Sequence, residues 1–357
     1  MRIAVVTDAW HPQVNGVVTT LTRTVVMLGE AGHEVTVINP WMFKTIPCPT
    51  YPEIRLSLFP GRMIREILDS FQPDAIHIAT EGMLGWSARR YCRKRGLRFT
   101  TSYHTRFPEY VRLRVPLPLA LSYALMRRFH SAAKRTMVAT EDLRDELTGR
   151  GFANLVLWSR GVDTEIFQPR PKDFLADPRP IFLFVGRVAV EKNIEDFLRL
   201  DLTGTKYVVG DGPALAEMRK KYPDVRFPGY KKGMELARYM AAADVFVFPS
   251  RTDTFGLVIL EALACGVPVA AYPVTGPRNI IRSGVTGCLD EDLGKAVVGA
   301  LRLDGAQCRV FAENYSWRKC TAQFFNNLFV PATRRATVVS RDSEMAADNI
   351  QKEKVRG

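Results

Sequence analysis

Two carboxylates spaced eight residues apart, Asp253 and Glu261, occupy the apolar stretch "SRTDTFGLVILEALACG" that runs from Ser250 to Gly266. The apolar residues behind Asp253 recur at helical spacing, which predicts a helix that starts near Phe255 or Gly256. Eight residues of helix span roughly 12 Å, whereas the two carboxylates of a retaining glycosidase lie about 5 Å apart. The two acids therefore cannot share one scissile bond.

One long ligand, contacted at both ends, would suit this spacing. A diphosphate could lie on the helix N-terminus at Gly256 and Leu257, with a sugar toward Asp253 and ribose hydroxyls toward Glu261. The alternative is an ordinary core helix that carries one solvated glutamate. Its N-cap would then be one of the side chains of Ser250, Thr252, Asp253 or Thr254.

A second set of candidates follows a buried strand in "VGRVAVEKNIEDFL". Arg187 and Lys192 stand at a strand end and a helix start, where two cations beside helix-terminal amides can hold a diphosphate without a metal. The alternative is a pair of surface cations in a polar loop. The tight turn at Asp211 and Gly212 in "VVGDGP" also follows a strand, and by itself it indicates only a turn.

Metal-binding patterns are weak in this chain. Asp290 and Asp292 form a literal D-x-D, but they open a predicted helix, where acids complement the N-terminus, so capping is the favoured interpretation. The six cysteines show no C-x-x-C pair and no zinc spacing, which predicts free thiols in a reducing compartment. We therefore expect no metal and no cofactor.

Strand-like and helix-like runs alternate along most of the 357 residues, which predicts an α/β protein with two Rossmann-like domains that face a cleft. The expected divisions are residues 1–168 for the N-terminal domain, 169–180 for a linker, 181–308 for the C-terminal domain, 309–330 for a C-terminal helix and 331–357 for a disordered tail. Ligands of such sheets bind at the carboxyl ends of the strands.

Positive charge is concentrated in the first half of the chain. The net charge is +13, and residues 55–135 hold 16 Lys and Arg against 5 Asp and Glu, a local charge of +11. A basic, apolar face in this region could lie on an anionic membrane leaflet. Its residues would be Arg112, Arg114, Leu117, Leu119, Arg127 and Arg128.

The alternative for this face is that its leucines pack into the domain while its arginines are solvated. Neither a recognition helix nor an aromatic platform for bases is visible, so we expect no nucleic-acid partner. The chain opens on a strand, without a signal-like segment, and the apolar run from Phe255 to Val274 is broken by charge, glycine and proline. We therefore expect a cytoplasmic protein attached peripherally to the inner face of the membrane.

Several motifs in this order resemble glycosyltransferase family 4, whose fold is GT-B: "DAWHPQVNGVVTTL", "SYHTRF", "GRVAVEKN", "VVGDGP", "ADVFVFPSRTDTFGLVILEALACGVPVAA" and "SGVTGCLD". The resemblance covers about residues 1–330 and is closest to the bacterial glycolipid-forming branch. It implies that the C-terminal helix returns to the N-terminal domain.

The resemblance also implies roles for individual residues. Arg187 and Lys192 would bind the donor diphosphate, with Asp211 and Gly212 near the donor, and Glu261 would bind the ribose. The backbone from Phe255 to Leu257, including Gly256, would bind the phosphates, and Asp253 stands where the family has Glu beside the donor sugar. In the N-terminal half, Gly16 would allow a close approach to the donor and His104 matches the active-site histidine, with Asp8 and Arg160 as lesser candidates.

The implied reaction is metal-independent sugar transfer that retains the anomeric configuration. The favoured donor is UDP-glucose or UDP-glucuronate, and the favoured acceptor is a membrane lipid such as diacylglycerol. A GDP-mannose-dependent α-mannosyltransferase acting on a phosphatidylinositol-type or other glycolipid acceptor is the main alternative, followed by a UDP-sugar epimerase. The sequence contains no indication of the oligomeric state.

Overall fold

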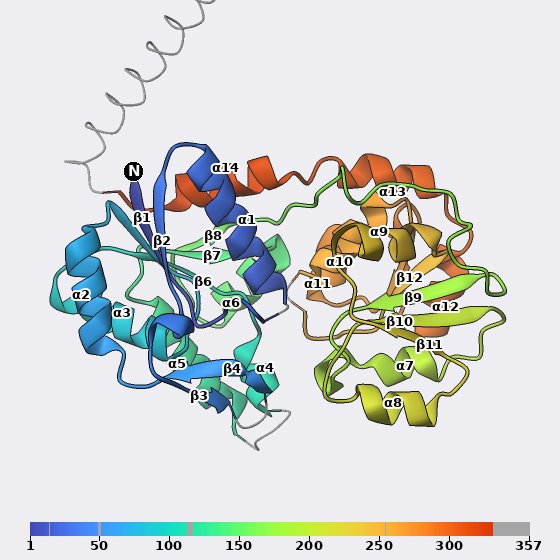
Figure 1. The fold of residues 1–357 in the computed structure, drawn as a ribbon, viewed down its shortest axis with the longest axis horizontal. Helices are drawn as coiled ribbons and strands as arrows, with labels where there is room; N and C mark the ends of the chain where they lie inside the picture. The colour runs from blue at the N-terminus through green and yellow to red at the C-terminus, as the bar shows by residue number, and fades with distance from the viewer. Residues whose placement is uncertain (14, 49–50, 113–116, 254, 331–357) are drawn as a thin grey trace, which may run out of the picture.

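The computed structural model describes residues 1–13, 15–48, 51–112, 117–253 and 255–330 (Figure 1). Outside the described residues lie Arg114, Thr254 and residues 331–357. Disorder is expected from the sequence for residues 331–357. Two parallel sheets, one in each half of the chain, dominate the rest.

Six parallel strands form the first sheet within the described residues, in the spatial order β2 (Glu34–Ile38), β1 (Arg2–Val6), β5 (Ala75–Ile78), β6 (Thr100–Ser102), β7 (Arg135–Val138) and β8 (Leu155–Leu157). The helices of this half are α1 (Gly16–Glu30), α2 (Gly61–Phe71), α3 (Met83–Lys94), α4 (Phe107–Arg112), α5 (Leu119–His130) and α6 (Glu141–Gly149). A short 3₁₀ turn, η1 (Pro40–Met42), precedes an antiparallel hairpin of β3 (Thr45–Cys48) and β4 (Tyr51–Ser57).

The second sheet is also parallel, in the order β11 (Arg226–Gly229), β10 (Thr205–Val209), β9 (Ile181–Val185), β12 (Val245–Phe248), β13 (Val269–Ala271) and β14 (Gly287–Leu289). Its helical elements are η2 (Val190–Lys192), α7 (Ile194–Leu198), α8 (Leu215–Lys221), α9 (Gly233–Ala242), α10 (Leu257–Ala264), α11 (Thr275–Ile280), α12 (Leu293–Ala300) and α13 (Gly305–Ala312). The expected α/β fold with two Rossmann-like halves is confirmed.

The central strands are apolar without alternation because helices cover both faces of each sheet. Strand β9 reads IFLFV and β12 reads VFVF, and every residue of both is buried. Side chains of β9 alternate between two core clusters: Leu183 belongs to one and Phe184 to the other. Continuous burial of this kind is typical of parallel strands between helical layers.

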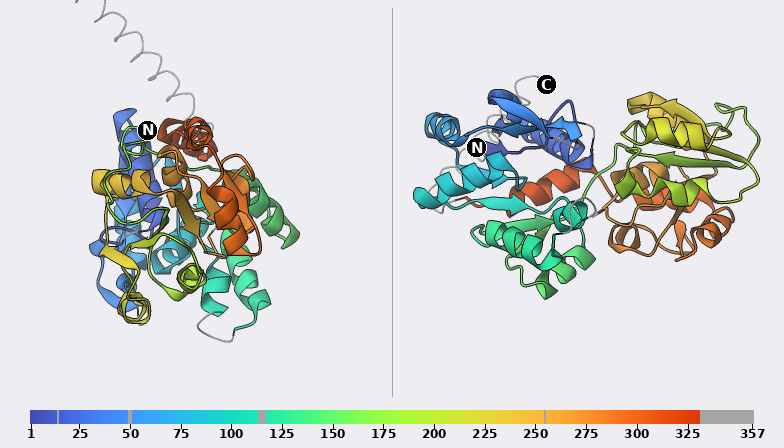
Figure 2. Two further views of the ribbon diagram at one scale, coloured as in Figure 1. Left: turned by 90° about the vertical axis from the view of Figure 1, so that its right-hand side faces the viewer. Right: turned by 90° about the horizontal axis from the view of Figure 1, so that it is seen from below.

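The last helix, α14 (Trp317–Asn327), lies on the first domain, next to α1 (Figure 1). Cys320 and Phe324 of α14 are fully buried in one core cluster with Ile3 of β1 and Leu21 of α1. In the view from below, this red helix runs within the first domain while the rest of the C-terminal half stands beside it (Figure 2). The return of the C-terminal helix is thus part of the fold.

Residues 309–330, where we expect a single helix, contain the end of α13 and the whole of α14. The chain leaves the helical conformation after α13 and starts again at Ser316, whose hydroxyl accepts a hydrogen bond from Lys319 N (3.2 Å). This capping serine explains why the helical pattern is interrupted.

Both sheets reverse their strand order at one point, and ligands of open α/β sheets bind at such a point. In the second sheet the reversal lies between β9 and β12, because the chain moves to β10 and β11 on one side and to β13 and β14 on the other. The loops after β9 and β12 carry the "GRVAVEK" and "SRTDTFG" motifs. The topology therefore brings the two candidate sets together.

Candidate active site

The loops after β9 and β12 meet through an ion pair between Lys192 and Asp253. Lys192 Nζ lies 2.6 Å from Asp253 Oδ1, and the two side chains are 21% and 17% exposed. Burial lowers the pKa of Lys192, but the adjacent Asp253 carboxylate outweighs it, so that the pKa is raised and the amine stays charged. Among the described residues nothing donates to Asp253 Oδ2, which is buried.

The N-terminus of α10 is open toward these side chains. Gly256 is the N-cap and has a φ of 91°, a conformation that favours glycine. No side chain of the described residues caps this helix, so its first amides are available to an anion. Of the four possible caps, Ser250 and Thr252 do not cap this helix: both hydroxyls instead donate to Glu191 O, at 3.5 and 3.2 Å, and connect the two loops.

Glu261 lies on α10, four residues after its first residue, Leu257. Burial raises the pKa of its carboxyl to about 7. Glu261 is near Tyr230, whose pKa is raised by burial and then by this carboxyl. The predicted ribose-binding acid is thus poised to change its charge near neutral pH.

The first domain approaches α10 with the N-terminus of α1. A methyl group added at Gly16 would lie 3.4 Å from Leu257 Cδ1, so the start of α1 lies against the side chain of the first residue of α10. Asn15 caps α1, and its Oδ1 accepts from Val17 N and Val18 N, both at 3.0 Å. The structure therefore brings Gly16 and Leu257, two predicted donor-site residues, together from opposite domains.

Tyr110 of α4 also reaches the second domain, although the sequence motifs did not single it out. Its pKa is raised by burial, and its hydroxyl interacts with Thr252, Lys192 and Asp253. It stands six residues after His104 in "SYHTRFPEY", so its position in that motif is the signal that could have identified it. Tyr110 adds a phenol from the first domain to the Lys192–Asp253 pair.

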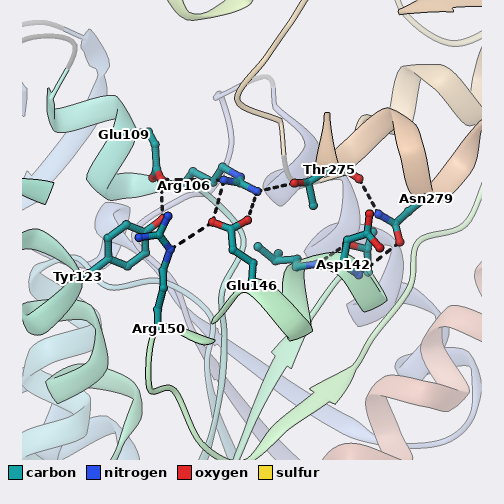
Figure 3. Close-up of polar contacts among 10 residues, drawn as sticks. Arg106, Glu109, Tyr123, Asp142, Glu146, Arg150, Thr275 and Asn279 are labelled. Atoms are coloured by element: carbon teal, nitrogen blue, oxygen red, sulfur yellow. Dashed lines mark hydrogen bonds and ion pairs between the residues drawn. The ribbon is translucent and has the colours of Figure 1, made fainter. Parts of the chain in front are cut away.

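A polar contact between the domains lies beside this group (Figure 3). Arg106 Nη2 donates to Thr275 Oγ1 of α11 at 2.7 Å, and the same guanidinium forms a two-point pair with Glu146 of α6. Asp142 N donates to Asn279 Oδ1 at 3.5 Å. We call this set the interdomain contact: Arg106, Glu146 and Asp142 from the first domain, Thr275 and Asn279 from the second.

Helix α11 joins the interdomain contact to the loop after β12, which carries Asp253 and is called the donor loop below because the sequence predicts that it binds the donor. A methyl group added at Gly276 would lie 2.6 Å from Asp253 O and 3.1 Å from Phe255 O. Only a residue without a side chain permits this approach. The position of Asp253 therefore depends on α11, and α11 in turn is held by Arg106.

His104 and Arg160 form a separate buried pair in the first domain. His104 follows β6 and is 8% exposed, and its Nδ1 lies 3.0 Å from Arg160 Nη2. The imidazole also meets the ring of Trp158 edge to face, with centroids 5.4 Å apart. These contacts join residues of the first domain to one another.

Other predicted residues have structural partners. Asp8 accepts from Leu84 N (2.9 Å), Gly85 N (3.3 Å) and the Thr80 hydroxyl (2.9 Å), so its carboxylate holds the start of α3. Burial outweighs these bonds and raises its pKa. Asp292 accepts from Gly294 N and Lys295 N and caps α12, as its position predicts.

The Asp211–Gly212 turn supports the loop that carries Arg187. Val188 N donates to Asp211 O at 2.9 Å, and a methyl group at Gly212 would lie 2.4 Å from Val188 O. Arg187 itself is half-buried. The turn therefore shapes the diphosphate-binding loop that the sequence predicts.

The predicted membrane face is only partly as expected. Leu119 is partly buried against a core cluster and Leu117 is partly buried, whereas the exposed leucines of α5 are Leu121 (59%) and Leu125 (46%). Arg112 and Arg128 are exposed, and Arg127 is half-buried and donates to Arg150 O at 3.0 Å. No helix in the described part of the chain has the length and apolarity needed to cross a bilayer.

Comparison with known proteins gives two family matches. Residues 14–166 match a family described as Glycosyltransferase Family 4, and residues 179–302 match one described as Glycosyl transferases group 1. A GDP-mannose-dependent alpha-mannosyltransferase of Mycobacterium tuberculosis is 31% identical over 81% of this chain and 83% of its own length. A sulfoquinovosyl transferase of Arabidopsis thaliana is 31% identical over 81% of this chain and 63% of its length.

An alpha-monoglucosyldiacylglycerol synthase of Streptococcus pneumoniae is 28% identical over 84% of this chain and 78% of its length. The fold matches that of a sucrose-phosphate synthase from Thermosynechococcus elongatus, with a TM-score of 0.74 at 20% identity, covering 95% of this chain and 99% of the other. Two family matches, long alignments and this fold agree with one another. The chain is a glycosyltransferase and belongs to glycosyltransferase family 4.

Proposed function

We propose that this enzyme transfers a hexose or hexuronic acid from a nucleotide diphosphate sugar to a membrane lipid, with retention of configuration and without a metal ion. The observation that carries the proposal is the Lys192–Asp253 pair at the open N-terminus of α10, where the first domain contributes Gly16 and Tyr110. A cation, a helix start and a carboxylate at one place suit a diphosphate joined to a sugar.

Different residues of the site bind different parts of the nucleotide sugar. The diphosphate lies on the amides after Gly256, with Lys192 and Arg187 as its cations, and Glu261 accepts from the ribose hydroxyls. Lys192 then turns from Asp253 to the diphosphate. Asp253 retains an acceptor oxygen for a hydroxyl of the sugar.

The chemical step proceeds on one face of the sugar. The bond between the anomeric carbon and the diphosphate oxygen breaks as the acceptor hydroxyl forms its bond from the same side. The proton of that hydroxyl passes to the leaving diphosphate, and the products are a glycoside and a nucleoside diphosphate. Lys192, Arg187 and the helix start stabilise the charge that develops on the leaving group.

Two observations support a lipid acceptor. The exposed apolar side chains of α5, Leu121 and Leu125, lie on the same helix as Arg128, in a segment of the chain that is strongly basic. Relatives whose alignment covers most of this chain include an alpha-monoglucosyldiacylglycerol synthase, whose name describes glycolipid synthesis. We propose that the enzyme acts from the cytoplasmic surface of the membrane.

Two classes of donor, UDP-sugars and GDP-mannose, are proposed for test. Diacylglycerol as acceptor with UDP-glucose or UDP-glucuronate as donor is supported by the synthase of Streptococcus pneumoniae, whose name contains a glucosyl diacylglycerol. GDP-mannose is supported by the relative from Mycobacterium tuberculosis, which is 31% identical. The experiment supplies each nucleotide sugar with total membrane lipid and identifies the lipid products by mass spectrometry.

Lys192→Ala is expected to lower the transfer rate about 100-fold or more, the effect of removing one donor to developing charge. Lys172→Ala is the matched control, because Lys172 of the predicted linker pairs at 2.9 Å with Asp244, which precedes β12, whereas Lys192 pairs with Asp253, which follows it. A chelator is expected to leave the rate unchanged. Isomerised nucleotide sugar without glycolipid would instead support the epimerase, and full activity of Lys192→Ala would reject the diphosphate assignment.

A further inference from the structure

A buried arginine is hydrogen-bonded to His104. Arg160, three residues after the end of β8, is 5% exposed. Its Nη2 donates to His104 Nδ1 (3.0 Å), and its Nη1 donates to the carbonyl oxygens of Trp158 (2.5 Å) and Ser159 (3.0 Å). The guanidinium lies over the Trp158 ring, 4.8 Å from its centroid. This cation thus contacts two carbonyl oxygens, a histidine and an aromatic ring.

The direction of the hydrogen bond between Arg160 and His104 follows from chemistry. A guanidinium has only donors and does not lose its proton in proteins, so His104 Nδ1 must accept. A neutral imidazole that accepts at Nδ1 carries its hydrogen on Nε2. Serine hydrolases have the opposite arrangement, in which a carboxylate accepts from Nδ1–H and leaves Nε2 as a base.

The surroundings of His104 also keep it uncharged. Its pKa is lowered well below the ordinary value by burial, then by Arg160, with smaller contributions from His77 on β5 and His130 on α5. Burial lowers the pKa of Arg160 itself only to about 10, so the guanidinium remains charged at neutral pH. At neutral pH, Arg160 is therefore a cation and His104 is a neutral hydrogen-bond donor.

We propose that Arg160 is a positioning residue that holds His104 as the neutral Nε2–H tautomer, so that His104 donates a hydrogen bond to an oxygen of the bound nucleotide sugar and does not act as a general base. The first half of this statement concerns the free protein alone. The second half rests on the proposed function, because it assigns His104 to the donor site.

Nitrogen-15 NMR of the full chain, labelled at histidine, tests the first half without any substrate. The chain has five histidines, and the resonances of His104 are those that disappear in His104→Gln. At pH 7 we expect Nδ1 to carry no hydrogen and Nε2 to carry one, and we expect no titration of His104 between pH 5.5 and 9. A protonated Nδ1 at pH 7 in the wild-type protein would overturn the proposal.

Substitution of Arg160 tests whether this residue determines the tautomer of His104. In Arg160→Met we expect a mixture of tautomers and a pKa of His104 closer to the ordinary value, whereas Arg160→Lys, which keeps a donor, preserves the Nε2–H form. Arg89→Met is the matched control: Arg89 is 6% exposed and donates to Phe129 O (2.9 Å), so its loss also removes a buried arginine. An unchanged tautomer in Arg160→Met would overturn the proposal.

The transfer assay tests the second half. Arg160→Met is expected to lower kcat roughly 10-fold, the value of one hydrogen bond, with a smaller change in donor KM and with a new loss of activity at acid pH as His104 takes up a proton. Arg160→Lys recovers most of this loss. If the NMR result is as expected but His104→Gln transfers sugar at the wild-type rate, the donor role is rejected while glycolipid formation by the wild type still supports the proposed function.

Discussion

Asp253, at the position where the resemblance predicts Glu, pairs with Lys192. Lys192 occupies one oxygen of this carboxylate at 2.6 Å, and the other is buried. A side chain one methylene shorter is therefore held by a partner within the same domain. We infer that Lys192 holds Asp253 in place until the donor arrives and then moves to the diphosphate.

Glu261 gives a prediction about pH. The folded protein raises its pKa from an ordinary 4.5 to about 7, so the protein binds this proton more tightly when folded and loses the corresponding stability as pH rises from about 4.5 through 7. Glu261→Gln removes the buried charge. It is expected to raise the Tm relative to wild type at pH 8, with a difference that shrinks toward zero at pH 5.

The same change should weaken donor binding, because a carboxylate accepts two ribose hydroxyls better than an amide. For the wild type, donor KM should fall as pH rises through 7, and Glu261→Gln should remove that dependence. Calorimetric scans at both pH values and donor titrations across pH 6–8 check these outcomes. A pH-dependent KM that persists in the variant would assign the ionisation to another group.

Sequence motifs could predict the residues of the second domain because each follows a strand of one sheet. Of the partners in the first domain, the motifs predicted Gly16 but not Arg106 or Tyr110. Arg106 and Thr275 are 169 residues apart, and Tyr110 meets Thr252 only because the domains are docked. Such contacts depend on the relative position of two cores, which no local pattern encodes.

At the scale of elements, the helix after Asp253 was predicted but its cap was not. Hydroxyl residues before a helix ordinarily cap it, and here Ser250 and Thr252 bind Glu191 O instead. The helix therefore starts at Leu257, after a left-handed Gly256. The N-terminus of α10, where we propose that the diphosphate binds, thus lacks a side-chain cap among the described residues.

The close contact of α11 with the donor loop gives a second prediction. Gly276→Ala would place a methyl group 2.6 Å from Asp253 O, so α11 or the loop must move. We expect donor KM to rise by roughly 10-fold or more, since misplacement by about 1 Å can cost up to 100-fold. Gly284→Ala is the control for a glycine substitution nearby in the chain, because its added methyl group meets nothing within 4 Å, although its φ of 80° adds backbone strain.

Donor kinetics and thermal unfolding separate the two effects. Gly284→Ala is expected to lower the Tm with little change in KM, whereas Gly276→Ala is expected to change KM. An unchanged KM in Gly276→Ala would show that the position of α11 does not matter to donor binding.

The alternation of strands and helices predicted both sheets, since each parallel strand is a continuous apolar run. The antiparallel hairpin of β3 and β4 follows a different rule and was not predicted. The break between α13 and α14 was missed because the apolar spacing continues across it, while the serine cap at Ser316 restarts the helix. The position of a helix boundary thus depends on a single side-chain hydrogen bond, which the spacing of apolar residues does not reveal.

At the scale of the whole molecule, the interdomain contact predicts a change in domain arrangement. Thr275→Val keeps the size of the side chain and removes the acceptor for Arg106 Nη2, while the Arg106–Glu146 pair remains (Figure 3). We expect a larger radius of gyration for the free enzyme in small-angle X-ray scattering, and a return to the wild-type value with nucleoside diphosphate.

Thr148→Val is the matched control, because the Thr148 hydroxyl donates to Arg144 O within α6 and not across the domains. If Thr275→Val scatters as the wild type does, the interdomain contact does not determine the arrangement of the domains.

The basic half of the chain gives a prediction about membranes. Replacing Arg127 and Arg128 with Glu changes the local charge by four units, and we expect binding to vesicles of anionic lipid to weaken by 10-fold or more, given about 1 kcal/mol per basic residue near the surface. Replacing Arg226 and Arg199 of the second domain in the same way is the charge-matched control. Equal binding of the first variant and the wild type in a sedimentation assay would reject the membrane face.

The return of α14 to the first domain has a consequence for synthesis. Phe324 and Cys320 complete the core around Ile3 and Leu21, and a methyl group at Gly161 would lie 2.5 Å from Trp317 N, so the last described helix is fitted tightly. Of the two domains, the one synthesised first is therefore completed last. The second domain can close its own core while the first still exposes apolar surface, because α14 follows the second domain along the chain.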